Sequence, residues 1–435
     1  MTAAPHSPYR RSTALMTDHY ELTMLQAALA EGSADRSCTF EAFTRRLPEG
    51  RRYGVVAGIG RVVEALHDFT FGDDELAQLA PILDEATLTY LSNYRFDGDI
   101  DAYPEGELFF AGSPILTVRG SFGSACILET LILSILNHDC AIASAAARMV
   151  SVAAGRRLIE MGSRRTHEES AVACARAAYL AGFGSTSNLE AGRRYGIPTG
   201  GTAAHSFTLL HDTEEAAFVA QIASLGVDTT LLVDTYDITQ GIATAIKVAG
   251  TDLGAIRIDS GDLGVLARAA RDQLDALGAT KTKVVLSGDL DEYAIAALRS
   301  EPVDVYGVGT SVVTGSGAPT ASMVYKLVEV DGRPVAKRSE NKKSYGGRKS
   351  ALRRYRDTGT ATEEVVYLAD GPAPESLAND KILPQPLLRA GKPVEGLPKL
   401  QDSRQHLAAA LVSLPWAGLK LSRGEAAIPT TSLIP

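Results

Sequence analysis

The sequence predicts an α/β protein whose central part is a parallel sheet of the barrel type. Short runs rich in β-branched and aliphatic residues recur at regular intervals, and the first three are each followed by a segment with the helical spacing of apolar residues. The runs are continuously apolar, as strands covered on both faces must be. The four clearest are TTLLVD (229–234), AIRID (255–259), KVVLS (283–287) and VDVYGVG (303–309).

Composition and net charge indicate a globular protein and argue against some classes of partner. The chain has 435 residues, of which 45% are apolar and 22% charged, enough for two or three globular domains with a large core. Its formal net charge of −9 argues against nucleic acid or an anionic membrane as the main partner. A small polyanionic substrate is compatible with this charge, because backbone amides and a few arginines bind phosphate within acidic proteins.

Cysteine usage and the first residues predict a cytoplasmic protein. The four cysteines are far apart, without the close pairs of a zinc site, and are interpreted as reduced, partly buried thiols. Residues 1–16 lack an apolar core of signal-peptide length and are predicted to form a flexible tail. The most apolar run, 127–136, contains Glu129 and is too short to span a bilayer, so a buried helix is expected there.

Residues 17–122 are predicted to form an α+β domain. A helix is expected over 17–32, because its apolar residues recur on one face and Gly32 can end it. Alternation over 37–46 predicts a half-buried strand. Tyr20, in the first turn of the helix, is either a packing residue or an aromatic surface for a ligand.

Residues 123–320 contain the predicted barrel. Ala-rich sequence from Ser124 onward predicts tightly packed helices and marks the boundary with the preceding domain. Three more strands are expected in RLIEMGSRR (157–165), AGFGSTSN (181–188) and IPTGGTAAHSF (197–207). With the four runs above there are seven candidate strands, close to the number that a barrel needs.

Residues 321–435 are expected to fold back onto the N-terminal domain as a β segment and tail. Asp331-Gly332 lies between two strand-like runs and is a strong hairpin signal. The basic stretch 337–356 is interpreted as a solvated face, with phosphate binding at its edge as the alternative. The remaining sequence contains several prolines and one expected helix, QHLAAALVSL.

Polar and small residues follow the predicted strands, at the edge where α/β enzymes place their sites. The glycine-rich turn after the last strand would let an anion approach the backbone closely, although a tight turn alone explains it equally well. The candidate residues at these strand ends are Asp259, Ser260, Ser287, Gly288, Asp289, Gly307, Gly309 and Thr310.

A histidine and an arginine are the most informative single residues. A lone histidine is more often structural than catalytic, but His205 follows two glycines and adjoins hydroxyl side chains, which weakens the structural interpretation. Imidazole, with a pKa near ~6.5, is a competent nucleophile. Arg257 lies two residues before Asp259, and alternation points both to one face. Either they form a mutual salt bridge, or Arg257 receives a planar carboxylate while Asp259 contacts a second group.

Seven motifs, in this order, give the chain a resemblance to the nicotinate phosphoribosyltransferases. They are TDHYELTM, FEAFTRRLP, MGSRR, GFGSTSN, GTAAHSF, RIDSGDL and GVGTSVVT, and the match runs from about residue 17 to residue 349. Their co-occurrence is far more specific than any one motif alone.

The resemblance implies a reaction and residue roles. Members of this family join nicotinate to phosphoribosyl pyrophosphate, form nicotinate mononucleotide and pyrophosphate, and couple the step to ATP hydrolysis. It implies that ATP transiently phosphorylates His205. It also implies that Tyr20, Arg165, Thr202 and Arg257 contact nicotinate.

The resemblance also implies the architecture and the cofactors. The expected fold is an irregular, incomplete TIM-like α/β barrel plus an α+β domain built from both ends of the chain. A homodimer is expected, with Tyr20 reaching the partner's site. Thr310 would hold phosphate, and Mg²⁺ would be held mainly by substrate oxygens. The pyridine nitrogen is already nucleophilic, so no general base is expected.

Two other functions compete with this one. A phosphoribosyltransferase for nicotinamide or quinolinate is the nearest, but an amide-specific site does not need an arginine such as Arg257 for a carboxylate. A non-catalytic, substrate-sensing relative is the second, and His205 in its glycine-rich frame argues against it. Thr166 and His167 follow the arginines at a point where relatives vary, and their role stays open.

Overall fold

The computed structural model describes residues 12–337 and 345–434, which form two compact units. Unit 1 comprises Met1–Ala141 and Thr320–Pro435, and unit 2 comprises Ile142–Pro319. The division therefore lies within a helix, further along the chain than the composition shift near Ser124. Most of the predicted tail and part of the basic stretch lie outside the described residues.

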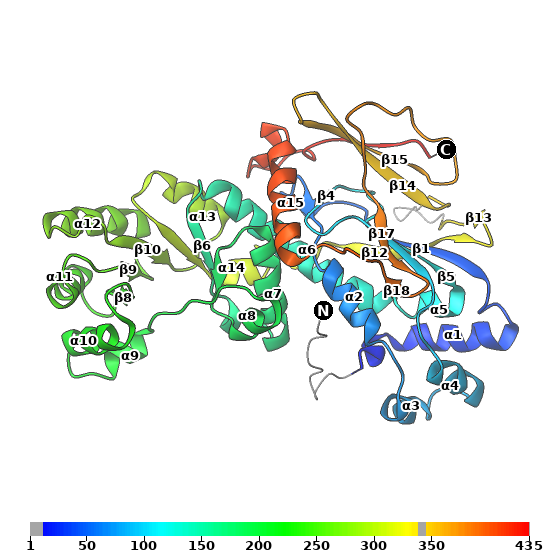
Figure 1. Ribbon diagram of the computed structural model, residues 1–435, viewed down its shortest axis with the longest axis horizontal. Helices are drawn as coiled ribbons and strands as arrows, with labels where there is room; N and C mark the ends of the chain where they lie inside the picture. Colours follow the sequence, from blue (N-terminus) through cyan, green and yellow to red (C-terminus); the bar gives the residue numbers. More distant parts are fainter. Residues whose placement is uncertain (1–11, 338–344, 435) are drawn as a thin grey trace. The chain divides into compact units, whose positions relative to one another are not determined.

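Unit 2 is a six-stranded, wholly parallel sheet with helices packed on it, in the order β7-β6-β11-β10-β9-β8 (Figure 1). Its open, curled form confirms the predicted incomplete barrel. Its strands are β6 (Arg157–Glu160), β7 (Ser185–Thr186), β8 (Thr230–Leu232), β9 (Ala255–Ile258), β10 (Lys283–Ser287) and β11 (Val305–Val308). Its helices are α7 (Glu168–Ala181), α8 (Leu189–Tyr195), α9 (His205–Leu209), α10 (Glu214–Leu225), α11 (Ile238–Ala249), α12 (Leu263–Ala276), α13 (Glu292–Ala297) and α14 (Thr310–Val313), with 3-10 turns η2 (Ser163–Arg165) and η3 (Leu298–Ser300).

Local sequence explains how strand passes to helix in unit 2. Apolar residues of the strands, such as Ile256 and Leu286, are fully buried, as a sheet covered on both faces requires. Several helices begin where a side-chain oxygen accepts a backbone N–H of the first turn. These caps are Asn188, Thr213, Asp237, Asp262 and Asp291.

The strand predicted over 197–207 is wrong. Only Thr199 forms a β-bridge there, to Thr186, and the segment then leads into α9, which begins at His205. Pro198 has no N–H to donate, and two glycines follow, so the segment is poorly suited to a strand.

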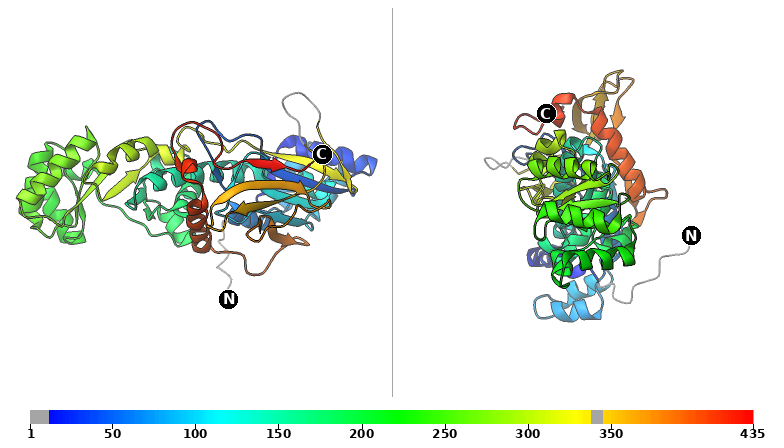
Figure 2. Two further views of the ribbon diagram at one scale, coloured as in Figure 1. Left: turned by 90° about the horizontal axis from the view of Figure 1, so that it is seen from above. Right: turned by 90° about the vertical axis from the view of Figure 1, so that its left-hand side faces the viewer.

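Unit 1 contains a seven-stranded antiparallel sheet that combines both ends of the chain, in the order β13-β12-β1-β5-β3-β17-β18. Figure 2 shows the N-terminal strands beside the yellow and orange C-terminal strands. The N-terminal elements are η1 (Ala14–Met16), α1 (His19–Glu31), β1 (Ser37–Thr44), β2 (Gly54–Val55), α2 (Ile59–His67), α3 (Asp73–Leu79), α4 (Glu85–Ser92), β3 (Asp99–Ala102), β4 (Leu108–Phe109), β5 (Leu116–Ser121) and α5 (Phe122–Cys126). The C-terminal ones are β12 (Met323–Val330), β13 (Arg333–Pro334), β14 (Lys349–Tyr355), β15 (Ala361–Leu368), β16 (Lys381–Ile382), β17 (Gln385–Arg389), β18 (Lys392–Pro393), α15 (Leu400–Ser413), η4 (Trp416–Leu419) and β19 (Thr430–Ser432).

The predicted hairpin is confirmed. Val330 of β12 pairs with Arg333 of β13, which leaves a two-residue loop at Asp331-Gly332. Both loop residues have positive φ, 49° and 71°, as a tight hairpin turn requires.

The start of the described chain is anchored to unit 1. Ser12 and Thr13 donate side-chain hydrogen bonds to backbone carbonyls of Thr70 and Ala65, and Ala14 is fully buried. Residues 12–16 therefore belong to the folded unit rather than to a free tail, and residues 1–11 lie outside the described residues.

Helix α6 (Glu129–Val152) continues from unit 1 into unit 2 and is mostly buried. The segment Phe122–Val152 is long and apolar enough to cross a bilayer by length and composition alone, but 67% of its most apolar window is buried in the protein, as in a core helix. The cysteines Cys38, Cys126, Cys140 and Cys174 are all buried thiols rather than members of disulfides.

Much of the described part of the basic stretch is not a solvated face, because two of its residues are buried in ion pairs. Lys349 contacts the buried Glu41, with Nζ 2.8 Å from Oε2. Arg353 is 1% exposed and lies between Glu107 and Glu364. These pairs join β14 to the N-terminal part of unit 1, and they make phosphate binding by the two side chains unfavourable.

Candidate functional site

The carboxyl edge of the sheet in unit 2 brings several predicted residues together. Arg257 and Asp259 alternate onto the same face of β9. Ser287, at the end of the neighbouring strand β10, donates its hydroxyl hydrogen to Asp259 Oδ1 at 2.5 Å and lies opposite Gly307 of β11. One face of three adjacent strands therefore carries a cation, a carboxylate, a hydroxyl and, at Gly307, backbone without a side chain.

Arg257 is a half-buried cation with unused hydrogen-bonding capacity. Its Nη1 donates to Thr202 Oγ1 at 3.1 Å, and its Nε is buried without a hydrogen-bond partner. Burial lowers the pKa of Arg257, while Asp259 and Asp234 oppose that shift. Asp259 is hydrogen-bonded to Ser287, and no ion pair joins it to Arg257 among the described residues. The geometry favours Arg257 as the receiver of an external anion over the mutual salt bridge.

His205 lies at the first position of α9, after Ala204 as the N-cap. Its Nδ1 is 3.1 Å from Thr235 Oγ1, and its Nε2 is 3.9 Å from Asp234 Oδ1. The side chain is 40% exposed, so a second molecule can reach the ring. The imidazole is thus both oriented and accessible, which is what a nucleophile requires.

Asp234 is a site residue that the sequence analysis missed. Its carboxylate is 1% exposed, and Oδ2 accepts hydrogen bonds from Asp259 N at 2.8 Å and Ser260 Oγ at 3.0 Å. Oδ1, the oxygen nearest His205, is buried without a hydrogen-bond partner. A signal was present in the sequence: Asp234 ends TTLLVD just as Asp259 ends AIRID.

The turn after β10 requires glycine and carries backbone strain. Gly288 has φ 131°, and a Cβ there would lie 2.3 Å from the carbonyl oxygen of Asp259. The next residue, Asp289, is exposed and has φ 46°, in the left-handed region that few side chains adopt. Such strain often accompanies a functional turn. Asp289 is thereby held at the same edge of the sheet as Ser287.

The loop after β11 holds the other predicted phosphate-binding residues. Gly309 is the N-cap of the short helix α14, whose first residue is Thr310. A Cβ on Gly307 would lie 2.8 Å from Met161 Sδ, so close packing accounts for that glycine. The loop's role in binding phosphate stays a prediction.

The remaining candidates, Arg165, Thr166 and His167, lie in or just after the turn η2. Arg165 is exposed in the turn η2. Burial is the main cause that lowers the pKa of Arg257, and the positive charge of Arg164, the neighbour of Arg165, lowers it further. Thr166 and His167 lie beyond this turn, and His167 is the N-cap of α7, with Nδ1 accepting from Glu169 N at 3.3 Å. His167 therefore has a local structural role.

Tyr20 belongs to unit 1, on the first turn of α1. It is 49% exposed, which excludes the interpretation as a fully packed core residue. Partial burial and the carboxylates of Glu129 and Glu21 raise its pKa, so the side chain is a neutral phenol. It is available to an external partner, and its contact with nicotinate stays a prediction.

The side chains near the site decide how the expected Mg²⁺ could be held. Among residues 12–337 and 345–434, no group of three His, Cys, Asp or Glu side chains is arranged to hold a metal ion. Asp234 and Asp259 supply carboxylate oxygens of the type that Mg²⁺ prefers, but only two residues. Such a set fits a cation whose other ligands come from a substrate.

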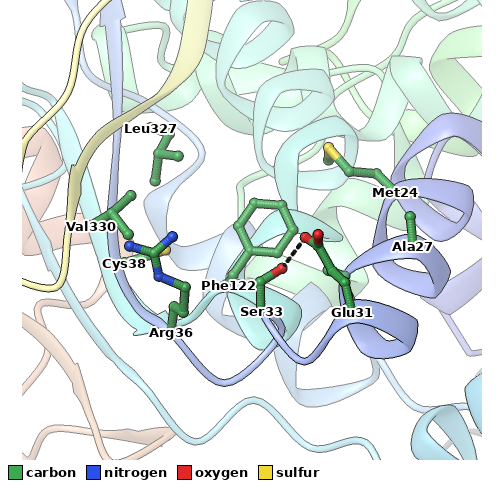
Figure 3. Close-up of a pocket in the computed structure, with 10 residues that line it drawn as sticks. Met24, Ala27, Glu31, Ser33, Arg36, Cys38, Phe122, Leu327 and Val330 are labelled. Atoms are coloured by element: carbon green, nitrogen blue, oxygen red, sulfur yellow. Dashed lines mark hydrogen bonds between the residues drawn. The ribbon is translucent and has the colours of Figure 1, made fainter.

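A groove of about 320 Å³ in unit 1 is a poor alternative site (Figure 3). Its lining is largely apolar, from α1, the start of α5 and β12, and includes Met24, Phe122 and Leu327. The cation in its lining, Arg36, is paired with Asp331, with Nη2 2.8 Å from Oδ2. The groove therefore offers an anionic substrate no cation comparable to Arg257, which has no ion pair among the described residues.

Comparison with known proteins adds independent findings. A family profile described as the nicotinate phosphoribosyltransferase N-terminal domain matches residues 15–137. The chain is 64% identical over 427 residues to the nicotinate phosphoribosyltransferase pncB1 of Mycobacterium tuberculosis, a match that covers 96% of this chain and 95% of the relative. It is 31% identical over 493 aligned positions to the human nicotinate phosphoribosyltransferase, with 92% of each chain covered. A crystal structure of human nicotinic acid phosphoribosyltransferase superposes with a TM-score of 0.82 at 27% identity, covering 95% of this chain and 97% of that one.

Proposed function

The chain belongs to the nicotinate phosphoribosyltransferase family, and we propose that unit 2 joins nicotinate to phosphoribosyl pyrophosphate in a step that ATP drives through phosphorylation of His205. The transferase activity itself follows from membership of the family and serves NAD biosynthesis. The observation that supports this use of the site is the half-buried Arg257, whose Nε has no partner. A half-buried guanidinium with a free donor fits the carboxylate of nicotinate.

The site residues can act on each part of the transfer. Arg257 and Thr202 would hold the nicotinate carboxylate, which leaves the pyridine nitrogen free to attack the anomeric carbon of the sugar. The new nitrogen–carbon bond forms as the bond from that carbon to the pyrophosphate oxygen breaks. Asp259 and Asp234 supply negative charge for the developing oxocarbenium character of the sugar. Mg²⁺, carried mainly by the phosphates, would neutralise the departing pyrophosphate.

Phosphate binding would fall to the turns at the same edge. Ser260 follows β9, Ser287 ends β10 and Gly288 follows it, and their hydroxyl or amide groups suit the ribose-phosphate oxygens. Gly309 and Thr310 would provide backbone amides and a hydroxyl for phosphate in the same way.

The geometry around His205 favours Nδ1 as the phosphorylated atom. Asp234 Oδ1 lacks a partner, so a small movement that closes its 3.9 Å separation from His205 Nε2 would let that nitrogen donate a hydrogen to it. In that tautomer Nδ1 carries the lone pair and would accept a hydrogen bond from the Thr235 hydroxyl, which lies 3.1 Å away. Attack by this lone pair on the γ-phosphorus of ATP forms a nitrogen–phosphorus bond and releases ADP.

The test of this proposal is a synthesis assay with labelled nicotinate and phosphoribosyl pyrophosphate, with and without ATP. The wild-type protein should form mononucleotide faster with ATP and take up acid-labile, base-stable phosphate from γ-labelled ATP. His205→Ala should lose both the label and the ATP stimulation. It should retain slow synthesis with a raised KM for phosphoribosyl pyrophosphate, because phosphorylation adds up to about two negative charges that reorder an existing site.

His211→Ala is the matched control for His205→Ala. His211 follows α9, and its Nδ1 lies 2.8 Å from the Phe207 carbonyl oxygen. This variant should keep both label and stimulation. Full ATP stimulation of His205→Ala would refute the phosphohistidine, and label that persists on it would move the phosphate elsewhere, with Ser206 the first residue to examine.

We also propose that the active form is a homodimer in which Tyr20 completes the partner's site. The exposed Tyr20 and Met24, one helical turn apart on α1, give unit 1 an apolar surface suited to a second copy. Mixing inactive Tyr20→Ala with His205→Ala should restore part of the ATP-stimulated rate. Each variant mixed with itself is the control. No recovery, when mass spectrometry shows that subunits have exchanged, would count against shared sites.

A further inference from the structure

A buried carboxylate behind the carboxyl edge of unit 2 has no role in the chemistry above. Glu160, the last residue of β6, is 1% exposed. Its Oε1 accepts from Gly162 N and its Oε2 accepts from Thr186 Oγ1, both at 2.5 Å. Among the described residues no cation lies within ion-pair distance of it. Burial raises the pKa of Glu160, although both hydrogen bonds lower it. A carboxylate in this environment costs stability relative to an apolar side chain, so packing does not explain it.

The hydrogen bonds continue from Glu160 in a chain that reaches the arginine-bearing turn. Thr186 Oγ1 accepts from Asn188 N at 3.0 Å. Asn188 Nδ2 then donates to Ser163 Oγ at 3.0 Å, while its Oδ1 caps α8 through Ala191 N. This Glu160 network therefore holds the turn η2 at two points: the backbone of Gly162 and the side chain of Ser163.

The turn that the network holds is packed against the end of the neighbouring strand. Met161 N donates to the Val308 carbonyl at 2.8 Å. At Gly162 a Cβ would lie 2.9 Å from the Gly309 carbonyl oxygen and 2.2 Å from Val313 Cγ1, so only glycine fits there. The chain therefore enters the turn η2 beside the Gly309 loop, and its backbone at Gly162 is fixed by this packing.

We propose that Glu160, Thr186 and Asn188 are positioning residues that fix the turn η2, so that its arginines meet an anionic substrate in a preset geometry. This inference rests on the proposed function for the identity of the substrate. Because Arg165 of this turn is the residue that the family resemblance assigns to nicotinate, we expect nicotinate to be the substrate most affected. Preset geometry matters because ordering a mobile arginine side chain when the substrate binds weakens affinity by up to about tenfold.

The test combines two variants that are close in shape to the wild type. Glu160→Gln replaces one accepting oxygen by a donor, and Thr186→Val removes the hydroxyl that links Glu160 to Asn188. Each should raise the KM for nicotinate about tenfold and leave kcat within about twofold. Their double variant should be no worse than the worse single one, because both interrupt the same network.

Thr229→Val is the matched control, because it removes a threonine hydroxyl at the opposite end of the same sheet. Thr229 Oγ1 accepts from the buried Gln221 at 3.1 Å. This variant should leave the KM for nicotinate unchanged. Thermal unfolding of all variants separates positioning from stability: a rise in KM that follows a fall in Tm, in the control as well, would overturn the proposal.

Crystal structures of the wild type and of Glu160→Gln give a readout that does not depend on activity. The turn 163–165 should be displaced or disordered in the variant, while the strands of the sheet superpose. An unmoved turn would overturn the inference, as would a displaced turn with an unchanged KM. A wild-type protein that makes no mononucleotide would instead refute the proposed function and leave the structural comparison intact.

Discussion

Arg257→Ala should raise the KM for nicotinate by roughly 30-fold to several thousand-fold, with a smaller effect on kcat. Removing one partner of a buried, hydrogen-bonded charge pair costs about 2–5 kcal/mol, and each ~1.4 kcal/mol is tenfold in affinity. In this site the guanidinium is half-buried, contacts Thr202 and has a free Nε, so nicotinate would lose its main charged partner. Steady-state kinetics at saturating phosphoribosyl pyrophosphate measure the change.

Discrimination between bases gives the same prediction a second readout. The wild-type enzyme should strongly prefer nicotinate over nicotinamide in kcat/KM, because the neutral amide leaves Arg257 unpaired. Arg257→Ala should lose most of this preference. Arg157→Ala is the control, since Arg157 begins β6 at the opposite edge and donates from Nη2 to Ser185 Oγ. An unchanged KM in Arg257→Ala would move the carboxylate site elsewhere, with Arg165 and its neighbour Arg164 the next candidates.

Arg353→Ala should destabilise unit 1 by about 3–5 kcal/mol, the usual cost of breaking a buried ion pair from one side. Arg353 is 1% exposed; it donates to the Glu107 carboxylate, and its Nη2 lies 2.7 Å from both Glu364 Oε2 and the Leu108 carbonyl oxygen. Without it, two buried carboxylates face each other. Urea unfolding monitored by circular dichroism measures the loss.

The adjacent residue offers the control for Arg353→Ala. Arg354 is 23% exposed, pairs with Glu363 at 3.1 Å and lies 3.7 Å from Asp380, so Arg354→Ala should cost clearly less than Arg353→Ala. Equal losses in the two variants would contradict the assignment of Arg353 as a buried ionic centre.

The pH dependence of that loss has a definite sign. Burial alone would raise the pKa of Glu107, but the hydrogen bond from His406 and the charge of Arg353 lower it to about 2. A lowered folded-state pKa gives stability that is present above the unfolded value of about 4.3 and is lost as pH falls toward 2. The difference between wild type and Arg353→Ala should therefore be largest at neutral pH and shrink below pH 4.

Local signals account for what the sequence predicted correctly. The βα repeat of unit 2 and the Asp331-Gly332 hairpin depend on residues near one another in the chain, and both are confirmed. Arg353 shows the limit of such signals. It sits in a stretch whose charge suggested a solvated face, whereas its partner Glu107 comes from a distant part of the sequence. Periodicity carries no information about such a pairing.

The same limit applies to the site. Arg257 and Asp259 are recognisable because they lie at or just after the end of β9, whereas His205 is recognisable by the glycines and hydroxyl residues around it. Asp234 occupies an equivalent position at the end of an apolar run, and its contacts with Asp259 N and Ser260 Oγ show that it belongs to the site. Glu160 matters through hydrogen bonds to Gly162 and Thr186, and the second of these partners becomes its neighbour only when β6 and β7 pair.

The pairing of β1 with β12 has a consequence for the order of events on the ribosome. Phe40 lies opposite Leu327 in this ladder, so β1 cannot acquire that neighbour until all of unit 2 has been synthesised. Unit 2 is one continuous segment and can fold as it emerges, whereas the sheet of unit 1 is completed last. Until then β1 has one unpaired edge, which is a surface for chaperones or for faulty association between nascent chains.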